Sequence, residues 1–119
     1  MPVLSSGSKF VTHATALTTT SDTDCYVVPN NFSSHVEHLM IGNNSSSNKE
    51  YTLKYYEAAT TTTHILFTTH AVTGKGSESV FTVDKPLYIH AGDKIIVAAA
   101  DVNTLTVVVV AEEFFDPTQ

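Results

Sequence analysis

The stretch YIHAGDKIIVAAADVNTLTVVVVAEE, residues 88–113, contains two runs of β-branched and small apolar residues separated by short polar turns. Such residues favour extended backbone, and short runs bounded by Gly, Asp and Asn are typical of strands joined by tight turns. Gly92 lies in the first turn, where it can adopt a positive φ that a β-branched residue resists. The stretch therefore predicts strands over residues 94–100 and 105–113, with a shorter strand at 87–90 before the turn.

The rest of the chain has the same character, with Thr, Val, Tyr, Ile and Phe in short runs between polar turns. Further strands are expected over residues 10–18, 24–28, 34–41, 50–57, 65–69 and 79–83. About eight or nine strands at this spacing are typical of a sandwich or jelly roll rather than of βαβ units. We predict an all-β, antiparallel, jelly-roll-like β-sandwich in one domain, with an N-terminal tail (1–9), the sandwich (10–115) and a C-terminal tail (116–119).

The composition limits the classes of partner. With 42% hydrophobic and 15% charged residues in 119, the chain should fold as one domain with its own core. Twelve acidic residues against six Lys, with no Arg, give a net charge of −6, which disfavours nucleic acid and anionic lipid as partners. No apolar run approaches the roughly 20 residues of a membrane-spanning helix. We expect neither nucleic acid nor a membrane to be a partner.

Cys25 is the only cysteine, so no intrachain disulfide can form. The first ten residues, MPVLSSGSKF, lack the basic and apolar regions of a signal peptide, and we expect assembly in a reducing cytosol. No local motif of a nucleophile with its base surrounds Cys25 or any Ser. Cys25 is interpreted as a small apolar filler of the core, and no enzymatic activity is expected.

Six histidines raise the question of a metal site. His35 and His38 are the closest pair, but residues three apart in a regular strand point to opposite faces and could not share an ion. His13, His64, His70 and His90 are isolated in sequence and are interpreted as half-buried strand residues, although a long-range cluster of them is an alternative. Glu112 and Glu113 are interpreted as charged residues that protect the end of an apolar strand. We therefore expect no metal and no cofactor.

The last two strands are apolar on both faces, whereas a sandwich strand normally alternates apolar and polar residues. Ile96, Val108 and Val110 would leave an apolar stripe in water, and burying each is worth roughly 1.5 to 3 kcal/mol. The cover could be the chain's own N-terminal segment or a loop, or it could be another subunit.

The two ends of the chain are also apolar where free tails are usually polar. Phe114 is expected to continue the last strand into the core, whereas the other apolar end residues are expected to dock on a partner. The expected interface consists of Val3, Leu4, Ile96, Val108, Val110, Phe115 and Pro117.

Four segments resemble small structural proteins of tailed bacteriophages of the marine type: TTSDTDCYVVPNNF (19–32), IGNNSSSNKEYTLKYYEA (41–58), VFTVDKPLYIHAGDKIIVAAA (80–100) and AEEFFDP (111–117). The resemblance extends over most of the chain and includes no catalytic motif. It implies a β-sandwich virion protein that is made in the host bacterial cytoplasm and assembles on a capsid or a tail.

Within that resemblance, a capsid decoration, or cement, protein is favoured because a compact domain with apolar tails suits the bridging of neighbouring capsomers. The implied partners are the major capsid protein or other virion proteins, and the implied homo-oligomer is a trimer. The alternative is a tail or fibre component that binds a host glycan through the loop at residues 43–49 with Tyr55 or Tyr56 nearby.

Overall fold

The computed structural model describes residues 8–82 and 86–117, which form nine strands and no helix. None of these residues belongs to a helix of a length and hydropathy that would cross a membrane. The strands are β1 (Ser8–Ala16), β2 (Thr23–Val27), β3 (Phe32–Asn43), β4 (Lys49–Glu57), β5 (Thr62–Val72), β6 (Ser77–Phe81), β7 (Leu87–His90), β8 (Lys94–Ala99) and β9 (Leu105–Phe115).

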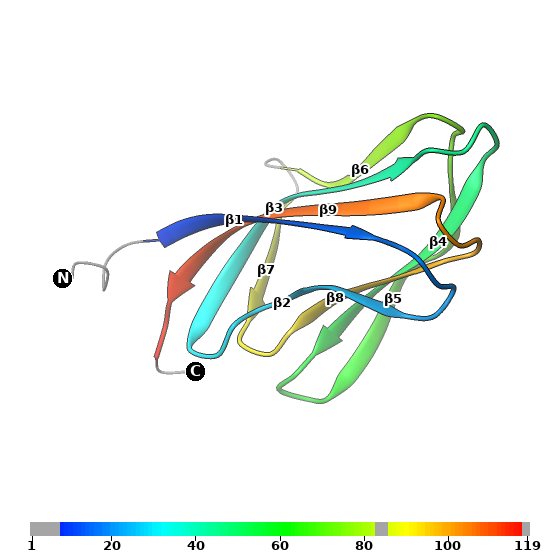
Figure 1. Cartoon of the computed structure of the whole chain (residues 1–119). Helices are drawn as coiled ribbons and strands as arrows, with labels where there is room; N and C mark the ends of the chain where they lie inside the picture. Colours follow the sequence, from blue (N-terminus) through cyan, green and yellow to red (C-terminus); the bar gives the residue numbers. More distant parts are fainter. Residues whose placement is uncertain (1–7, 83–85, 118–119) are drawn as a thin grey trace.

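The strands form two antiparallel sheets that face each other (Figure 1). The first sheet has the order β1-β9-β3-β6, with β7 also paired to β3, and the second has the order β2-β8-β4-β5. The predicted all-β sandwich is confirmed, and each expected strand has a counterpart in the structure. The first described strand begins at Ser8, two residues before the predicted start of the sandwich.

Strands that follow one another in the sequence are not always neighbours in a sheet. β1 pairs with β9 and β2 pairs with β8, so the first two strands are not a hairpin but belong to different sheets. The Gly92 turn likewise connects β7, which pairs with β3, to β8, which pairs with β2 and β4. Alternation of apolar residues specifies which face of a strand is buried, but it does not specify which strand lies beside it.

The core lies between the inward faces of the two sheets. On β9, Leu105, Val107, Val109 and Ala111 are buried and alternate with half-buried residues. The buried core residues from both sheets include Leu39, Ile41, Leu53, Ile95 and Val97. This packing follows from the period of two along each strand.

One extra residue interrupts the pairing of β3 with β9. Val36 lies opposite Ala111 and His38 lies opposite Val110, so Glu37 is the additional residue of a β-bulge. As a result His35, opposite Glu112, and His38 both lie on the outer face of the first sheet. The expectation that the two histidines point to opposite faces is wrong, because it assumed a regular strand between them.

Asp93 holds the turn that carries the chain from one sheet to the other. Its carboxylate is buried and accepts hydrogen bonds from the backbone N–H of Ala58 and of His90, both at 2.9 Å, and from the hydroxyl of Tyr55 at 2.8 Å. Gly92 precedes it with φ of 85°, as the sequence predicted.

Replacing Gly92 with Val should lower the free energy of unfolding by more than about 1 kcal/mol. The backbone is left-handed at this position, and an added Cβ would lie 3.0 Å from the Cβ of Ala58. Gly42→Val is the matched control, because a Cβ there meets nothing within 4 Å. Thermal and urea unfolding of both variants provide the measurement, and an equal effect at the two positions would contradict this description of the turn.

Cys25 is 3% exposed, and burial, partly offset by a hydrogen bond from the backbone of Val97, raises the pKa of its thiol to about 12 from 9.0. The native chain should therefore resist a thiol reagent at pH 8, whereas the urea-unfolded chain should react fully. Because the folded pKa is the higher one, the stability associated with this thiol is present below pH 9 and is lost as the pH rises toward 12. Rapid labelling of the folded chain would show that Cys25 is accessible.

Candidate functional site

Among the described residues, exposed large apolar side chains gather in two separate places, and Val27 and Val102 are exposed elsewhere. The first is β5, the edge strand of the second sheet, which pairs with β4 alone. Ile65, Leu66 and Phe67 are 62%, 41% and 39% exposed, and within β5 only Val72 is buried. We call this surface the β5 edge.

Apolar side chains of the β5 edge point to both faces of the sheet. Ile65 lies opposite Lys54 and Phe67 lies opposite Leu53, with a register shift between the two pairs. Because Leu53 and Lys54 are adjacent in β4, they point to opposite faces, and their partners do so too. Edge strands are commonly protected from pairing by Lys or Pro, and β5 contains neither. The β5 edge thus combines unpaired backbone groups with apolar side chains.

The second surface is a row of side chains across the outer face of the first sheet. The register places Phe10 of β1 beside Glu112 of β9, Glu112 beside His35 of β3, and His35 beside Tyr88 of β7. Phe10 and Tyr88, at the two ends of the row, are 64% and 67% exposed. The ring of Tyr88 stacks on the imidazole of His35, with centroids 4.5 Å apart. We call this surface the outer row.

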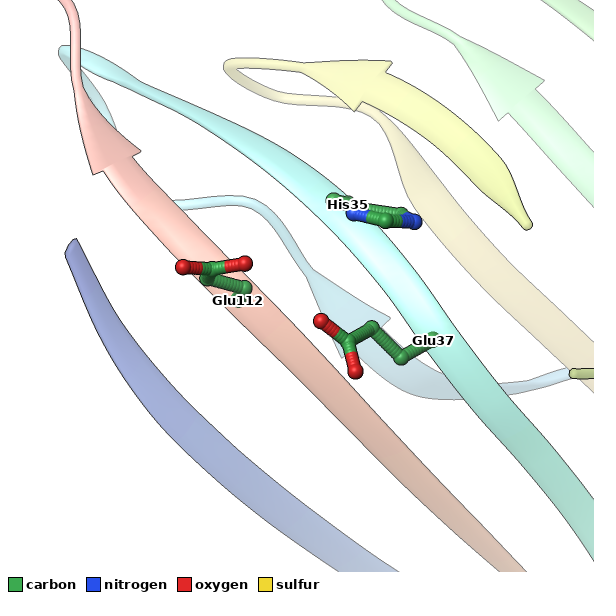
Figure 2. A group of neighbouring side chains, drawn as sticks. All are labelled: His35, Glu37 and Glu112. Carbon is green, nitrogen blue, oxygen red and sulfur yellow. The ribbon is translucent and has the colours of Figure 1, made fainter. Parts of the chain in front are cut away.

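Glu37, the bulged residue, brings a second carboxylate to the middle of the outer row (Figure 2). One potential ligand atom from each of His35, Glu37 and Glu112 lies within 4.8 Å of the other two, and all three side chains are half-buried. An imidazole and two carboxylates can hold a divalent cation or share a proton. Sequence reasoning missed this group, because the bulge that assembles it leaves no signal in the alternation of apolar residues.

The four histidines that are isolated in sequence, His13, His64, His70 and His90, are exposed rather than half-buried, contrary to the interpretation of the sequence. His64 lies 3.2 Å from a carboxylate oxygen of Glu57, and His70 lies 2.6 Å from one of Glu78. Among the described residues the four form no common cluster of metal ligands. Each of these two pairs is a surface contact of one imidazole with one carboxylate.

The expected interface residues do not form one stripe. Ile96 is in β8 of the second sheet, only 9% exposed, between Asp24 and Lys54 of the adjacent strands. Val108 and Val110 are half-buried on the outer face of β9 in the first sheet. Phe115 is 47% exposed and Pro117 is also exposed. Val3 and Leu4 lie outside the described residues.

Two residues at the end of β9 face the opposite way from the expectation. Glu113 points inward, is 3% exposed and accepts a hydrogen bond of 2.6 Å from the hydroxyl of Tyr26. Burial and the neighbouring Glu113 carboxylate raise the pKa of Tyr26 above its ordinary range. Phe114 continues the strand as expected, but it points outward and is 40% exposed. The alternation of β9 thus persists through its polar end, so Glu113 is a core residue and not a surface charge.

The residues expected to form a glycan site lie apart. Asn43 is buried, and its side-chain amide donates hydrogen bonds to the carbonyl oxygens of Ser47 and Val72, at 2.9 and 3.0 Å. Tyr55 lies about 20 Å along β4 from the end of this loop, at roughly 3.4 Å per residue. Its hydroxyl donates to Asp93. The loop and the tyrosines therefore do not form one platform.

Neither a protein-family model nor a curated protein sequence matches this chain. Among solved structures, the chain is similar to a protein of the disulfide-linked pili of Bacillus endospore appendages, with 9% identity, coverage of 98% of this chain and 96% of that one, and a TM-score of 0.51. Two viral structures give lower scores. The virus-like particle of the extra small virus of the giant freshwater prawn Macrobrachium rosenbergii has 10% identity, coverage of 96% and 82%, and a TM-score of 0.48.

The other viral structure is that of the Gx strain of infectious bursal disease virus, with 8% identity and a TM-score of 0.49. The match covers 95% of this chain and 32% of that one, so this chain corresponds to about a third of the viral protein. At identities this low the pilus likeness concerns the fold alone. It shows that the β-sandwich of this chain is also the fold of a pilus protein.

Proposed function

We propose that this chain is a structural protein of a virion, and specifically a capsid decoration protein that binds and stabilises the shell. The observation that carries the proposal is the β5 edge, an unprotected edge strand whose apolar side chains point to both faces. In this proposal the chain has no catalytic role. Its partners are the major capsid protein or other virion proteins, and copies of itself.

The β5 edge is costly to leave in water. Fully burying side chains of the size of Ile65, Leu66 and Phe67 is worth roughly 1.5 to 3 kcal/mol each, and a partner can supply that burial. The free edge of β5 can also pair with a strand of another subunit, which adds backbone hydrogen bonds and fixes the orientation of the two molecules. Both contributions favour assembly over a free monomer.

A decoration protein must contact more than one neighbour, and this chain exposes apolar groups on both of its sheets. The β5 edge belongs to the second sheet, whereas Phe10 and Tyr88 lie on the outer face of the first. Phe114, from β9, adds to the exposed aromatic surface of the first sheet. Two surfaces on different sheets would allow one copy to bridge two subunits of a shell.

The fold is compatible with this role, because the similar pilus protein has this fold and forms a polymer. That polymer is disulfide-linked. Cys25 is buried in the core, so subunit contacts in the present case would be noncovalent. The phage resemblance of the sequence favours the virion over other assemblies and the trimer over other oligomers. The separation of the loop from Tyr55 and Tyr56 argues against the glycan-binding alternative.

Changing Ile65 and Phe67 together to Lys should convert an oligomer, with a trimer expected, into a monomer without altering the fold. Both side chains are exposed, so the charges should affect association far more than folding. Val102→Lys is the matched control, because Val102 is 48% exposed but lies in the turn before β9. Sedimentation velocity gives the oligomeric state, and circular dichroism reports the fold.

The same three proteins should then be added to virions from which the chain has been removed. Wild type and Val102→Lys should bind, and the double variant should not. A wild-type chain that stays monomeric at high concentration and fails to bind particles would refute the assembly role.

A further inference from the structure

The centre of the outer row brings an imidazole and two carboxylates together without bonding them to one another. His35 and Glu37 come from β3 on either side of Val36, and Glu112 comes from β9 directly opposite His35. Figure 2 shows both carboxylates on the same side of the imidazole, which presents one ring nitrogen toward them. The ligand atoms of the three residues lie within 4.8 Å of one another, yet no hydrogen bond or ion pair joins these described side chains.

Neither carboxylate is paired with a charged side chain among the described residues. Among the described residues six ion pairs form, and they engage Asp22, Asp24, Glu57, Glu78, Asp101 and Glu113. Neither Glu37 nor Glu112 takes part in any of them, although both are half-buried. Partly desolvated carboxylates in close proximity repel one another, so a positive charge between them would be strongly stabilising.

The surroundings of His35 hold its ring in place but leave part of it unsatisfied. Tyr88 stacks on the imidazole with an interplanar angle of 24°, which fixes the orientation of the ring. The Nε2 atom of His35 is buried and has no hydrogen-bond partner among the described residues. A buried polar atom without a partner is uncommon in proteins, where such an atom usually bonds to a water or an ion. Figure 2 shows the two ring nitrogens at opposite ends of the imidazole with only one turned toward the carboxylates, so the ligand geometry of the group is carried by that nitrogen and the unsatisfied Nε2 is a separate feature of the ring.

We propose that His35, Glu37 and Glu112 bind one divalent cation of the zinc class. Imidazole nitrogen with carboxylate oxygen is a donor set that zinc accepts, whereas calcium prefers six to eight oxygens. The hydroxyl of Ser8 donates to Oε2 of Glu112, which holds that carboxylate and leaves Oε1 to the ion. Three protein ligands on an open sheet face leave a fourth position for water. The proposal revises the expectation of no metal and is independent of the assembly role.

Titration of the EDTA-stripped, full-length chain with zinc chloride in a phosphate-free buffer tests the site. We expect one zinc ion per chain, followed by calorimetry and confirmed by elemental analysis after gel filtration. Glu112→Gln and Glu37→Gln should each weaken binding by about 10- to 100-fold or more. Glu50→Gln is the matched control, since it removes the same charge from an exposed carboxylate on β4 and should leave the affinity unchanged.

The ligand nitrogen can be identified directly by NMR of the chain with ¹⁵N-labelled histidine. On addition of one equivalent of zinc, one set of ring nitrogens should shift, and His35→Gln should remove that set, whereas His64→Gln should not. Calcium at the same concentration should produce no such shift. Because all three residues are on the outer face, circular dichroism of the variants should match that of wild type.

Several results would overturn the proposal. Zinc could fail to bind at stoichiometric concentration, in which case the three side chains do not form a cation site. Binding could instead persist undiminished in Glu37→Gln and Glu112→Gln, or fall equally in Glu50→Gln, in which case zinc binds elsewhere or to the acidic surface in general. Each of these outcomes leaves the test of the β5 edge unaffected.

Discussion

The antiparallel pairing of β3 with β9, and the single extra residue that it contains, determine much of what this chain can do. The pairing places alternate residues of both strands in the core, where Leu39 and Val109 are fully buried opposite each other. Beyond the bulge at Glu37 the inward pattern resumes with Val36 and Ala111. Removing the bulge would shift one half of the pairing by one residue and turn its buried side chains outward. The same extra residue brings His35, Glu37 and Glu112 together on the outside.

The fold was predictable from the sequence because its strands are short, rich in β-branched residues and bounded by turn-forming residues. The limits of β7 match the prediction, and the left-handed Gly92 follows from the Ala91-Gly92-Asp93 reversal. These features depend on residues that are close together in the sequence, so one amino-acid sequence is enough to predict them. The role of Asp93 as the buried acceptor of the turn is not local. Two of its hydrogen-bond donors, Tyr55 in β4 and Ala58 just after β4, are far from it in sequence.

Features that depend on which strands are neighbours were not predictable. The alternation of apolar and polar residues could not show that β1 and β2 belong to different sheets. It also could not show that Ile96 and Val108 lie in different sheets. It also could not reveal a bulge, and for that reason the two histidines of β3 were assigned to opposite faces. Among the candidate interface residues, Phe115 and Pro117 are exposed, whereas Ile96 is only 9% exposed between its cross-strand neighbours. The exposure of β5 was missed because an edge strand and an inner strand can have the same composition.

The proposed function assigns the β5 edge and the exposed aromatic residues of the first sheet to assembly, and a decorated capsid would use both surfaces. The most direct measurement is an image reconstruction, by electron cryomicroscopy, of the particle that contains the chain. The account predicts many copies at symmetry-related positions over the shell, with Ile65 and Phe67 of β5 buried against a neighbouring subunit. A few copies at a single vertex or on the tail, or copies on the shell whose β5 faces solvent, would contradict it.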